Sequence, residues 1–119
     1  MGRAIRVEVD GLDRLQRRLD QLPDEIRQAA EQAVADEVDA VASDMRENAP
    51  VASGELRDSI EGEVDGLSGT VRARARHAVF VEHGTSSTPE QPFAQPAAEV
   101  SRRRFPRRLP EAVRRELRK

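Results

Sequence analysis

The longest regular pattern in the sequence is helical and runs from Pro23 to about Asn48. Apolar side chains recur there every three or four residues, the spacing of one helix face; they are Ile26, Ala30, Val34, Val38, Val41 and Met45. Pro23 suits a first helical position, and Asp24 and Glu25 suit the positive end of the helix dipole. At roughly 1.5 Å per residue the helix is about 37 Å long, whereas a compact domain of this chain length is only about 27 Å across. The helix is therefore expected to span the whole domain and could protrude from it.

The side chains available to build a core are few and small. The 119 residues include three Phe and no Tyr, Trp or Cys, and 37% of residues are hydrophobic against 35% charged. Ala, Val and Leu must therefore fill a thin core in a single domain, residues 1–119, and further burial against neighbouring subunits is expected. The absence of Cys removes disulfides, thiolate catalysis and zinc-thiolate sites.

No segment is expected to enter a membrane. No apolar run approaches the roughly 20 residues of a membrane-spanning helix. The start, Met-Gly-Arg-Ala-Ile-Arg, lacks the apolar region of a signal peptide. We expect a soluble protein that is made in the cytoplasm.

Alternation of apolar and charged residues predicts three strands. An N-terminal strand carries Ile5, Val7 and Val9, and two further runs, 60–65 and 71–76, are joined by a short connection that predicts a β-hairpin. The charged residues are acidic in the first run of the hairpin, whereas they are arginines in the second run. Cross-strand ion pairs are therefore expected, each contributing tenths of a kcal/mol.

The glycines and arginines of this hairpin need an interpretation of their own. The glycines form no phosphate-binding pattern and are interpreted as turn residues; they are Gly62, Gly66 and Gly69. The arginines could bind nucleic acid instead of pairing with the neighbouring strand; they are Arg72, Arg74 and Arg76.

Helical spacing predicts two further helical segments. Four leucines indicate a short amphipathic helix over residues 11–23. A C-terminal segment begins near Pro92, should break at Pro106 and Pro110, and ends in a basic helical extension over residues 101–119. The predicted fold class is α+β: a small antiparallel sheet, formed by the N-terminal strand and the hairpin, is packed by the long helix and the C-terminal helical segment.

No group of residues indicates catalysis. His77 and His83 are six residues apart, which fits neither one helix face nor a ligand motif, and the lack of Cys argues against a zinc site. No nucleophile with a base and no pair of carboxylates in a cleft is indicated. We expect a protein without enzyme activity, metal or cofactor.

Charge is distributed unevenly along the chain. Residues 1–70 carry 17 acidic and 8 basic side chains and residues 71–119 carry 5 and 12, so −9 and +7 give the total of −2. Either the halves fold onto each other, or a surface of both signs orients neighbouring copies or partners. One basic cluster could neutralise phosphates or face a protein partner; it consists of Arg102, Arg103, Arg104, Arg107 and Arg108.

Two motifs carry a family resemblance. Residues 49–60, Ala-Pro-Val-Ala-Ser-Gly-Glu-Leu-Arg-Asp-Ser-Ile, follow the long helix, and residues 78–85, Ala-Val-Phe-Val-Glu-His-Gly-Thr, precede residues 91–97, Gln-Pro-Phe-Ala-Gln-Pro-Ala. In their order and spacing these motifs resemble the small neck and tail-completion proteins of long-tailed bacteriophages. Ser53 stands where that family usually has Thr, and both histidines stand where it has aromatic rings. The arginine-rich end after residue 101 matches nothing in the family pattern.

The resemblance implies a structural virion protein of the phage head-tail junction or tail top, without catalysis. Several copies are expected to form a ring that completes the tail, joins it to the head and leaves a channel through which DNA passes without specific binding. The expected partners are other copies of the chain and the tail terminator, tail tube or head-completion proteins. The alternative is a small nucleic-acid-binding or regulatory protein that acts through its arginine-rich C-terminal helix.

The loop between the two halves of the second motif is the expected partner-facing element, the alternative being an ordinary loop packed on its own domain. Gly84 permits a positive φ, and prolines limit the freedom of the loop, so less entropy is lost on docking. Phe93 is the expected anchor, in the core or on a neighbour. Besides the five clustered arginines, the candidate interface residues are Phe80, Glu82, Gly84, Thr85, Pro89, Pro92 and Phe93.

Overall fold

The computed structural model describes residues 4–9, 21, 23–51 and 54–119. Its elements are β1 (Ile5–Val9), α2 (Asp24–Asn48), α3 (Gly54–Asp58), β2 (Ile60–Asp65), β3 (Ser68–Ala73), α4 (Ala78–His83) and α5 (Ala94–Leu117). The predicted α+β class is confirmed. The predicted short helix over residues 11–23 falls mostly outside the described residues.

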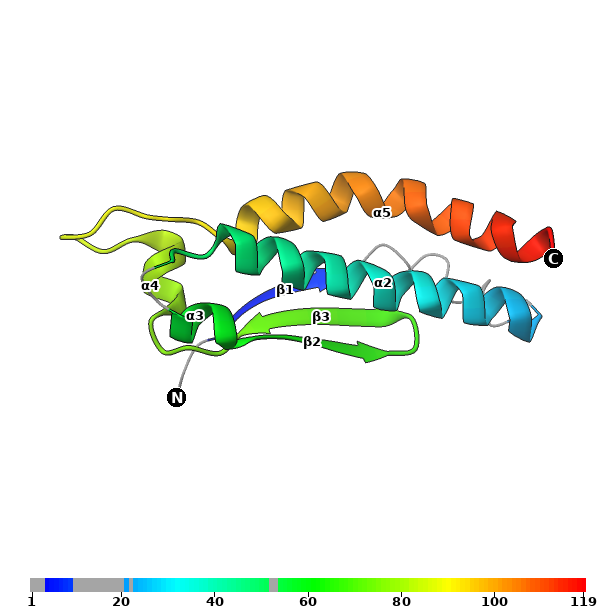
Figure 1. Ribbon diagram of the computed structural model, residues 1–119, viewed down its shortest axis with the longest axis horizontal. Coiled ribbons are helices and arrows are strands. Elements are labelled where there is room, and N and C mark those ends of the chain that lie inside the picture. The colour runs from blue at the N-terminus through cyan, green and yellow to red at the C-terminus, as the bar shows by residue number, and fades with distance from the viewer. Residues whose placement is uncertain (1–3, 10–20, 22, 52–53) are drawn as a thin grey trace.

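One antiparallel sheet and two long helices form the body of the protein (Figure 1). The strand order is β1-β3-β2, with Val7 opposite Val71 in one pair and Gly62 opposite Val71 in the other. α2 packs on β2 and β3, and α5 packs beside α2 and against β1. The predicted cover of the sheet by the long helix is therefore confirmed, and α5 completes it.

The protein is elongated and measures 54 × 25 × 21 Å. The expected domain width of about 27 Å assumed a compact shape. The structure differs because α2 and α5 lie side by side along the same axis. The long helix consequently spans much of the molecule without needing to leave it.

The apolar stripe predicted for α2 forms the centre of the core. All six of its members are buried, and the core cluster continues through Leu56, Ile60, Val71 and Phe93. Pro23 caps α2 just before its first residue, Asp24, one position earlier than expected. The stripe also contains Glu37, which is 1% exposed and which periodicity did not identify.

Two glycines of the hairpin let α2 approach the sheet closely. A Cβ atom on Gly69 would lie 2.4 Å from Cγ2 of Val38 and 3.1 Å from Cγ1 of Val34, and one on Gly62 would lie 2.5 Å from Cγ1 of Val38. Non-bonded carbon atoms pack at roughly 3.5–4.0 Å, so no larger residue fits here without a shift of the helix. Our interpretation of Gly62 and Gly69 as turn residues is therefore wrong, because both lie within strands and face a helix.

Gly66 does serve as a turn residue. It and Leu67 connect β2 to β3, and its φ is 59°. A positive φ at the first of two connecting residues is typical of a type II′ hairpin turn. The side chain of Leu67 returns to the core and is 6% exposed.

Ion pairs cross the hairpin as expected. Arg72 pairs with Glu63, and Nε of Arg74 lies 3.2 Å from Oε2 of Glu61. Because both acids are largely exposed, each pair contributes only about 0.2–1 kcal/mol. β3 ends at Ala73, which corrects the predicted strand over 71–76 and leaves Arg74 beyond its end.

The continuity of α5 contradicts the predicted break. Pro106 and Pro110 both lie inside the helix, and both are exposed. The two carbonyl groups that lose their helical hydrogen bonds are therefore on the side that water can reach, and a helix bends away from its prolines, toward the core. Phe105, next to Pro106, is 4% exposed and packs in the core. Figure 1 shows α5 as an arch. Residues 101–117 are thus the second half of one helix.

We predict that Gly69→Ala destabilises the protein by about 1–3 kcal/mol, because the added methyl group overpacks the stiff, buried Val38. The measurement is the urea dependence of unfolding. Gly54→Ala is the matched control, since its Cβ would meet nothing within 4 Å. A Gly69→Ala protein as stable as the wild type would show that α2 can move away from the sheet at little cost.

Candidate partner interface

A loop over residues 84–92 leaves α4, projects from one end of the molecule and returns to α5 (Figure 1). Gly84 opens it with a φ of 76° and donates its N–H to the carbonyl of Phe80 at 2.8 Å. A Cβ atom at this position would lie 2.8 Å from the backbone nitrogen of Glu90 and 3.0 Å from the carbonyl oxygen of Thr88. Both the backbone conformation and the space therefore require glycine.

The loop is internally bonded although its side chains are exposed from Thr85 to Pro92. The Thr85 N–H donates to the Thr88 carbonyl at 2.8 Å, and the Thr85 hydroxyl oxygen accepts the N–H of Thr88 at 3.0 Å. The Gln91 N–H donates to the carbonyl of Val81 at 2.8 Å, and this bond holds the second half of the loop against α4. Pro89 and Pro92 restrict the rest of the backbone. The conformation is therefore largely formed before any partner binds.

Glu82 holds the loop to the first turn of α5. One carboxylate oxygen accepts the N–H groups of Phe93 and Ala94 at 2.9 and 2.8 Å, and the other accepts that of Gln95 at 3.0 Å. These are three of the N–H groups that a helix start leaves without partners, and a negative charge there also suits the helix dipole. Glu82 is 5% exposed, so it acts inside this chain and not on its surface.

Phe93 is also internal. Its side chain is fully buried, and its carbonyl oxygen accepts a hydrogen bond from Nδ2 of Asn48 at 3.2 Å. Of the two anchoring roles considered for Phe93, the structure places it in the core of its own chain. Phe80 differs, because it is 59% exposed on α4 near the base of the loop.

Arg104 joins α5 to α2. Its guanidinium donates to both carboxylate oxygens of Glu37, at 2.6–3.1 Å, and to Oδ2 of Asp44 at 3.1 Å. The Glu37 side chain is 1% exposed, whereas that of Asp44 is 30% exposed. The bonds to Glu37 are the main cause of a raised pKa for Arg104, with a smaller contribution from Asp44 against the opposing effect of burial.

The remaining predicted arginines are on the surface. Arg102, Arg103, Arg107 and Arg108 are exposed, and Arg103, Arg107 and Arg108 line a shallow hollow around Val100. The loop and these arginines lie on different elements, and the structure does not bring them into one site. Glu82 and Phe93 are buried, and the half-buried Arg104 is bound to α2, so the other candidate interface residues form two separate surfaces.

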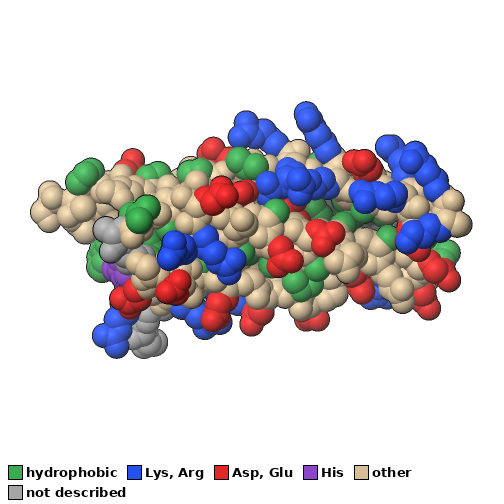
Figure 2. Space-filling model, viewed as in Figure 1, with side chains coloured by type: hydrophobic (Ala, Val, Ile, Leu, Met, Phe, Trp, Pro, Cys, Tyr) green, Lys and Arg blue, Asp and Glu red, His purple; other side chains and the backbone are tan. Residues whose placement is uncertain are grey.

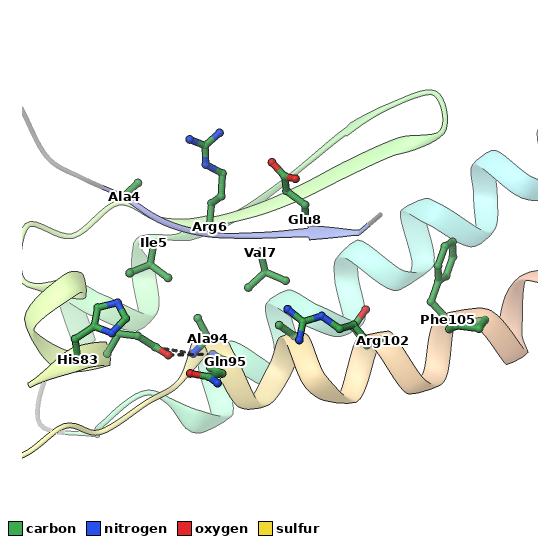
Figure 3. Close-up of a pocket in the computed structure, with 14 residues that line it drawn as sticks. Ala4, Ile5, Arg6, Val7, Glu8, His83, Ala94, Gln95, Arg102 and Phe105 are labelled. Atoms are coloured by element: carbon green, nitrogen blue, oxygen red, sulfur yellow. Dashed lines mark hydrogen bonds between the residues drawn. The ribbon is translucent and has the colours of Figure 1, made fainter. Parts of the chain in front are cut away.

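Sequence reasoning missed a groove of about 750 Å³ between β1 and α5 (Figure 3). Ile5 and Val7 point from the strand toward α5, while Arg6 and Glu8 point away. β1 is an edge of the sheet. The groove forms where this strand meets a helix some 90 residues later in the chain, so no local pattern could have indicated it.

Neither a metal-binding group nor a membrane-spanning helix is found among the described residues. They contain no group of three or more His, Asp or Glu side chains that could hold a metal ion. None of the helices in this part of the chain is long and apolar enough to cross a membrane.

A family of phage proteins matches this chain. The family model described as "Bacteriophage HK97-gp10, putative tail-component" matches residues 13–84, more than half of the sequence. The chain therefore belongs to this family of bacteriophage tail components, which confirms the resemblance to phage tail proteins. The match ends at Gly84, so the rest of the exposed loop, residues 85–92, and α5 lie beyond it. No curated protein and no solved structure matches the chain.

We predict that Glu82→Gln destabilises the protein by about 2 kcal/mol, because one amide oxygen cannot replace the charged carboxylate at three N–H donors. Urea unfolding measures the loss, and faster hydrogen exchange at Phe93 and Ala94 locates it. Glu90→Gln, in the exposed loop, is the control and should stay within about 0.5 kcal/mol of the wild type. Equal stabilities for the two variants would contradict the capping role.

We predict that Arg104→Met costs about 3–5 kcal/mol, because it leaves the buried carboxylate of Glu37 without its cation. Replacing both partners, as Glu37→Leu with Arg104→Met, should recover most of this loss, since an apolar pair needs no ionic partner. Denaturant unfolding of the wild type and the three variants, including Glu37→Leu alone, forms a double-mutant cycle. A double variant as unstable as Arg104→Met would argue against an unpaired carboxylate as the cause.

Proposed function

We propose that this chain is a structural component of the head-tail junction or tail top of a long-tailed phage. Several copies form a ring that completes the tail, matches it to the head and leaves a passage for DNA. The protein is made in the bacterial cytoplasm, ends in the virion and performs no catalysis. The observation that carries the proposal is the family match to phage tail components over α2, α3, the hairpin and α4.

The exposed loop supports a role in joining proteins. A partner that binds it meets a backbone already held by its own hydrogen bonds and prolines, so binding orders little additional chain. In this proposal Phe80, Gly84, Thr85, Pro89 and Pro92 form the surface that contacts the tail terminator, the tail tube or a head-completion protein. Phe80 provides the apolar contact, because aromatic side chains contribute most at protein interfaces.

The shape and charge of the chain suit a ring. In a ring each subunit contacts its two neighbours through two different surfaces, which must complement each other. α2 carries eight acidic and two basic side chains, and α5 carries three acidic and seven basic ones, net charges of −6 and +4. DNA would pass most freely along acidic surfaces, which repel it, so the arginines are assigned to protein contacts.

The second candidate is a small nucleic-acid-binding or regulatory protein. The exposed arginines of α5 favour it, because several phosphate contacts alone support non-specific binding. A DNA mobility-shift assay over a range of salt concentrations separates the two candidates. Tight binding of duplex DNA at physiological salt, lost when the exposed arginines are changed to Ser, would support this second function.

Electron microscopy of a phage that lacks the gene tests the main proposal. We expect filled heads and unattached or wrongly ended tails, which expression of the chain from a plasmid should rescue. Intact infectious particles without the chain would exclude a role at the junction.

We predict that Phe80→Ser lowers the yield of completed particles about tenfold while changing the free energy of unfolding by less than about 1 kcal/mol. The reason is that the exposed ring contributes little to the single chain and gains its contacts only when a partner binds. The yield is measured by complementation of the deleted phage, and the stability by urea unfolding. Val64→Ser is the matched control, since Val64 is also an exposed apolar residue, at 45% against 59%. Equal yields for both variants would remove Phe80 from the interface.

A further inference from the structure

The exposed arginines of α5 lack acidic partners within the described part of the chain. Arg104 is the one α5 arginine in the described ion pairs, and it is directed at α2. Arg103, Arg107 and Arg114 follow each other at helical spacing on the solvent side of α5, and we call them the α5 arginine face. Figure 2 shows Lys and Arg side chains gathered along α5. Within the described residues, their charge is therefore available to bind another molecule.

α2 presents a surface of the opposite sign. Asp36, Asp39 and Glu47 are exposed on the side of α2 away from the core, and we call them the acidic face of α2. No described ion pair involves them, and Asp36 accepts a hydrogen bond only from the neutral Gln32. Figure 2 shows acidic side chains over α2, next to the basic ones of α5. Each chain thus carries two surfaces of opposite charge that no described residue neutralises.

We propose that the α5 arginine face of one copy binds the acidic face of α2 on a neighbouring copy, with Arg103 and Arg107 opposite Asp36 and Asp39. This inference rests on the proposed function, because the neighbouring copy is the next subunit of the ring. It requires no further partner, since one chain supplies both halves of the contact.

The internal contact between the helices indicates which residues meet. Arg104 binds both Glu37 and Asp44, so this part of α5 lies at the level of α2 residues 37–44. α2 and α5 run in opposite directions (Figure 1). A rotation about an axis parallel to the two helices moves no residue along that axis. In a neighbour related by such a rotation, Asp39 therefore lies near the level of Arg103 and Arg107, and Asp36 lies within one turn.

The contact is more consistent with a second copy than with DNA. A ring requires two different complementary surfaces on one chain, and the charged faces of α2 and α5 provide them. Duplex DNA laid on the α5 arginine face would also approach the acidic face of α2 beside it, which repels phosphates. The arginines can satisfy their charge on a neighbouring copy without that repulsion.

A charge-swap experiment in the deleted phage tests this contact. Arg103→Asp with Arg107→Asp places like charges opposite each other, and so does Asp36→Arg with Asp39→Arg; each pair should lower the yield of completed particles at least about tenfold. The chain with all four changes restores opposite charges and should recover most of the yield. Unfolding midpoints of the purified chains check that each variant folds.

Disulfide trapping in the particle locates the contact. The chain contains no Cys, so Ser43→Cys with Val100→Cys introduces the only thiols. Both residues are exposed, and they lie near the level of the proposed contact on α2 and α5. A disulfide needs Cα atoms within about 7 Å, so mild oxidation should give dimers and larger multimers only if neighbouring copies meet there. Ser68→Cys with Val100→Cys, which uses the far tip of the hairpin, is the control.

The outcomes separate this inference from the proposed function. Rescue by the four-fold variant together with multimers supports the contact. The contact is overturned, while the function stands, if the chain with all four changes gives no higher particle yield than the chain with Arg103→Asp and Arg107→Asp alone. It is also overturned if the double-cysteine chain completes particles but is found there only as a monomer. If Arg103→Asp with Arg107→Asp abolishes DNA binding, and the added changes Asp36→Arg and Asp39→Arg do not restore it, the α5 arginine face binds DNA instead. Intact particles without the chain overturn the function, and sedimentation of the purified charge-swap variants then tests the contact by itself.

Discussion

The small size of the core side chains is the constraint on which the rest of the structure depends. α2 meets the sheet with Ala and Val residues, which fill little space, so the helix must lie close to the strands. Close approach in turn requires glycine under the helix, at Gly62 and Gly69. A chain with larger aromatic residues could separate the layers and tolerate side chains at both positions. Here the composition determines the spacing of the layers, and that spacing determines where glycine is required.

Because the apolar core is thin, charged side chains contribute to the position of α5. Glu82 binds its first turn, and Arg104 binds α2 near its middle. Both interactions are directional, whereas contacts among Ala and Val side chains permit sliding. Buried ion pairs add little net stability, but a Glu37 that lacks Arg104 would be costly, which disfavours other alignments of the two helices. The carboxylate of Glu82 likewise fixes the point at which the exposed loop ends, and hence its direction.

The elements with strong local patterns were predictable from the sequence, and the contacts between distant residues were not. The long helix, the hairpin and its ion pairs follow from spacing and charge within a few residues of one another. Glu82 gave no such signal, because its three N–H donors lie 11 to 13 residues later in the chain. Arg104 and Glu37 are 67 residues apart. The helix break expected at Pro106 and Pro110 failed for a related reason: which side of α5 faces water depends on the packing of α2, not on the prolines.

The same constraint connects the fold to assembly. A chain that is 35% charged cannot bury most of its charged side chains, and those left unneutralised oppose random association while permitting ordered association. Arg104 and Arg103 show the two cases on adjacent residues, one held by a buried carboxylate and one facing solvent without a partner in the described chain. Arg104 is already satisfied in the single subunit, so its contribution does not depend on neighbours. Arg103 has no acidic partner among the described residues, so its charge can be paired when another molecule approaches the solvent side of α5.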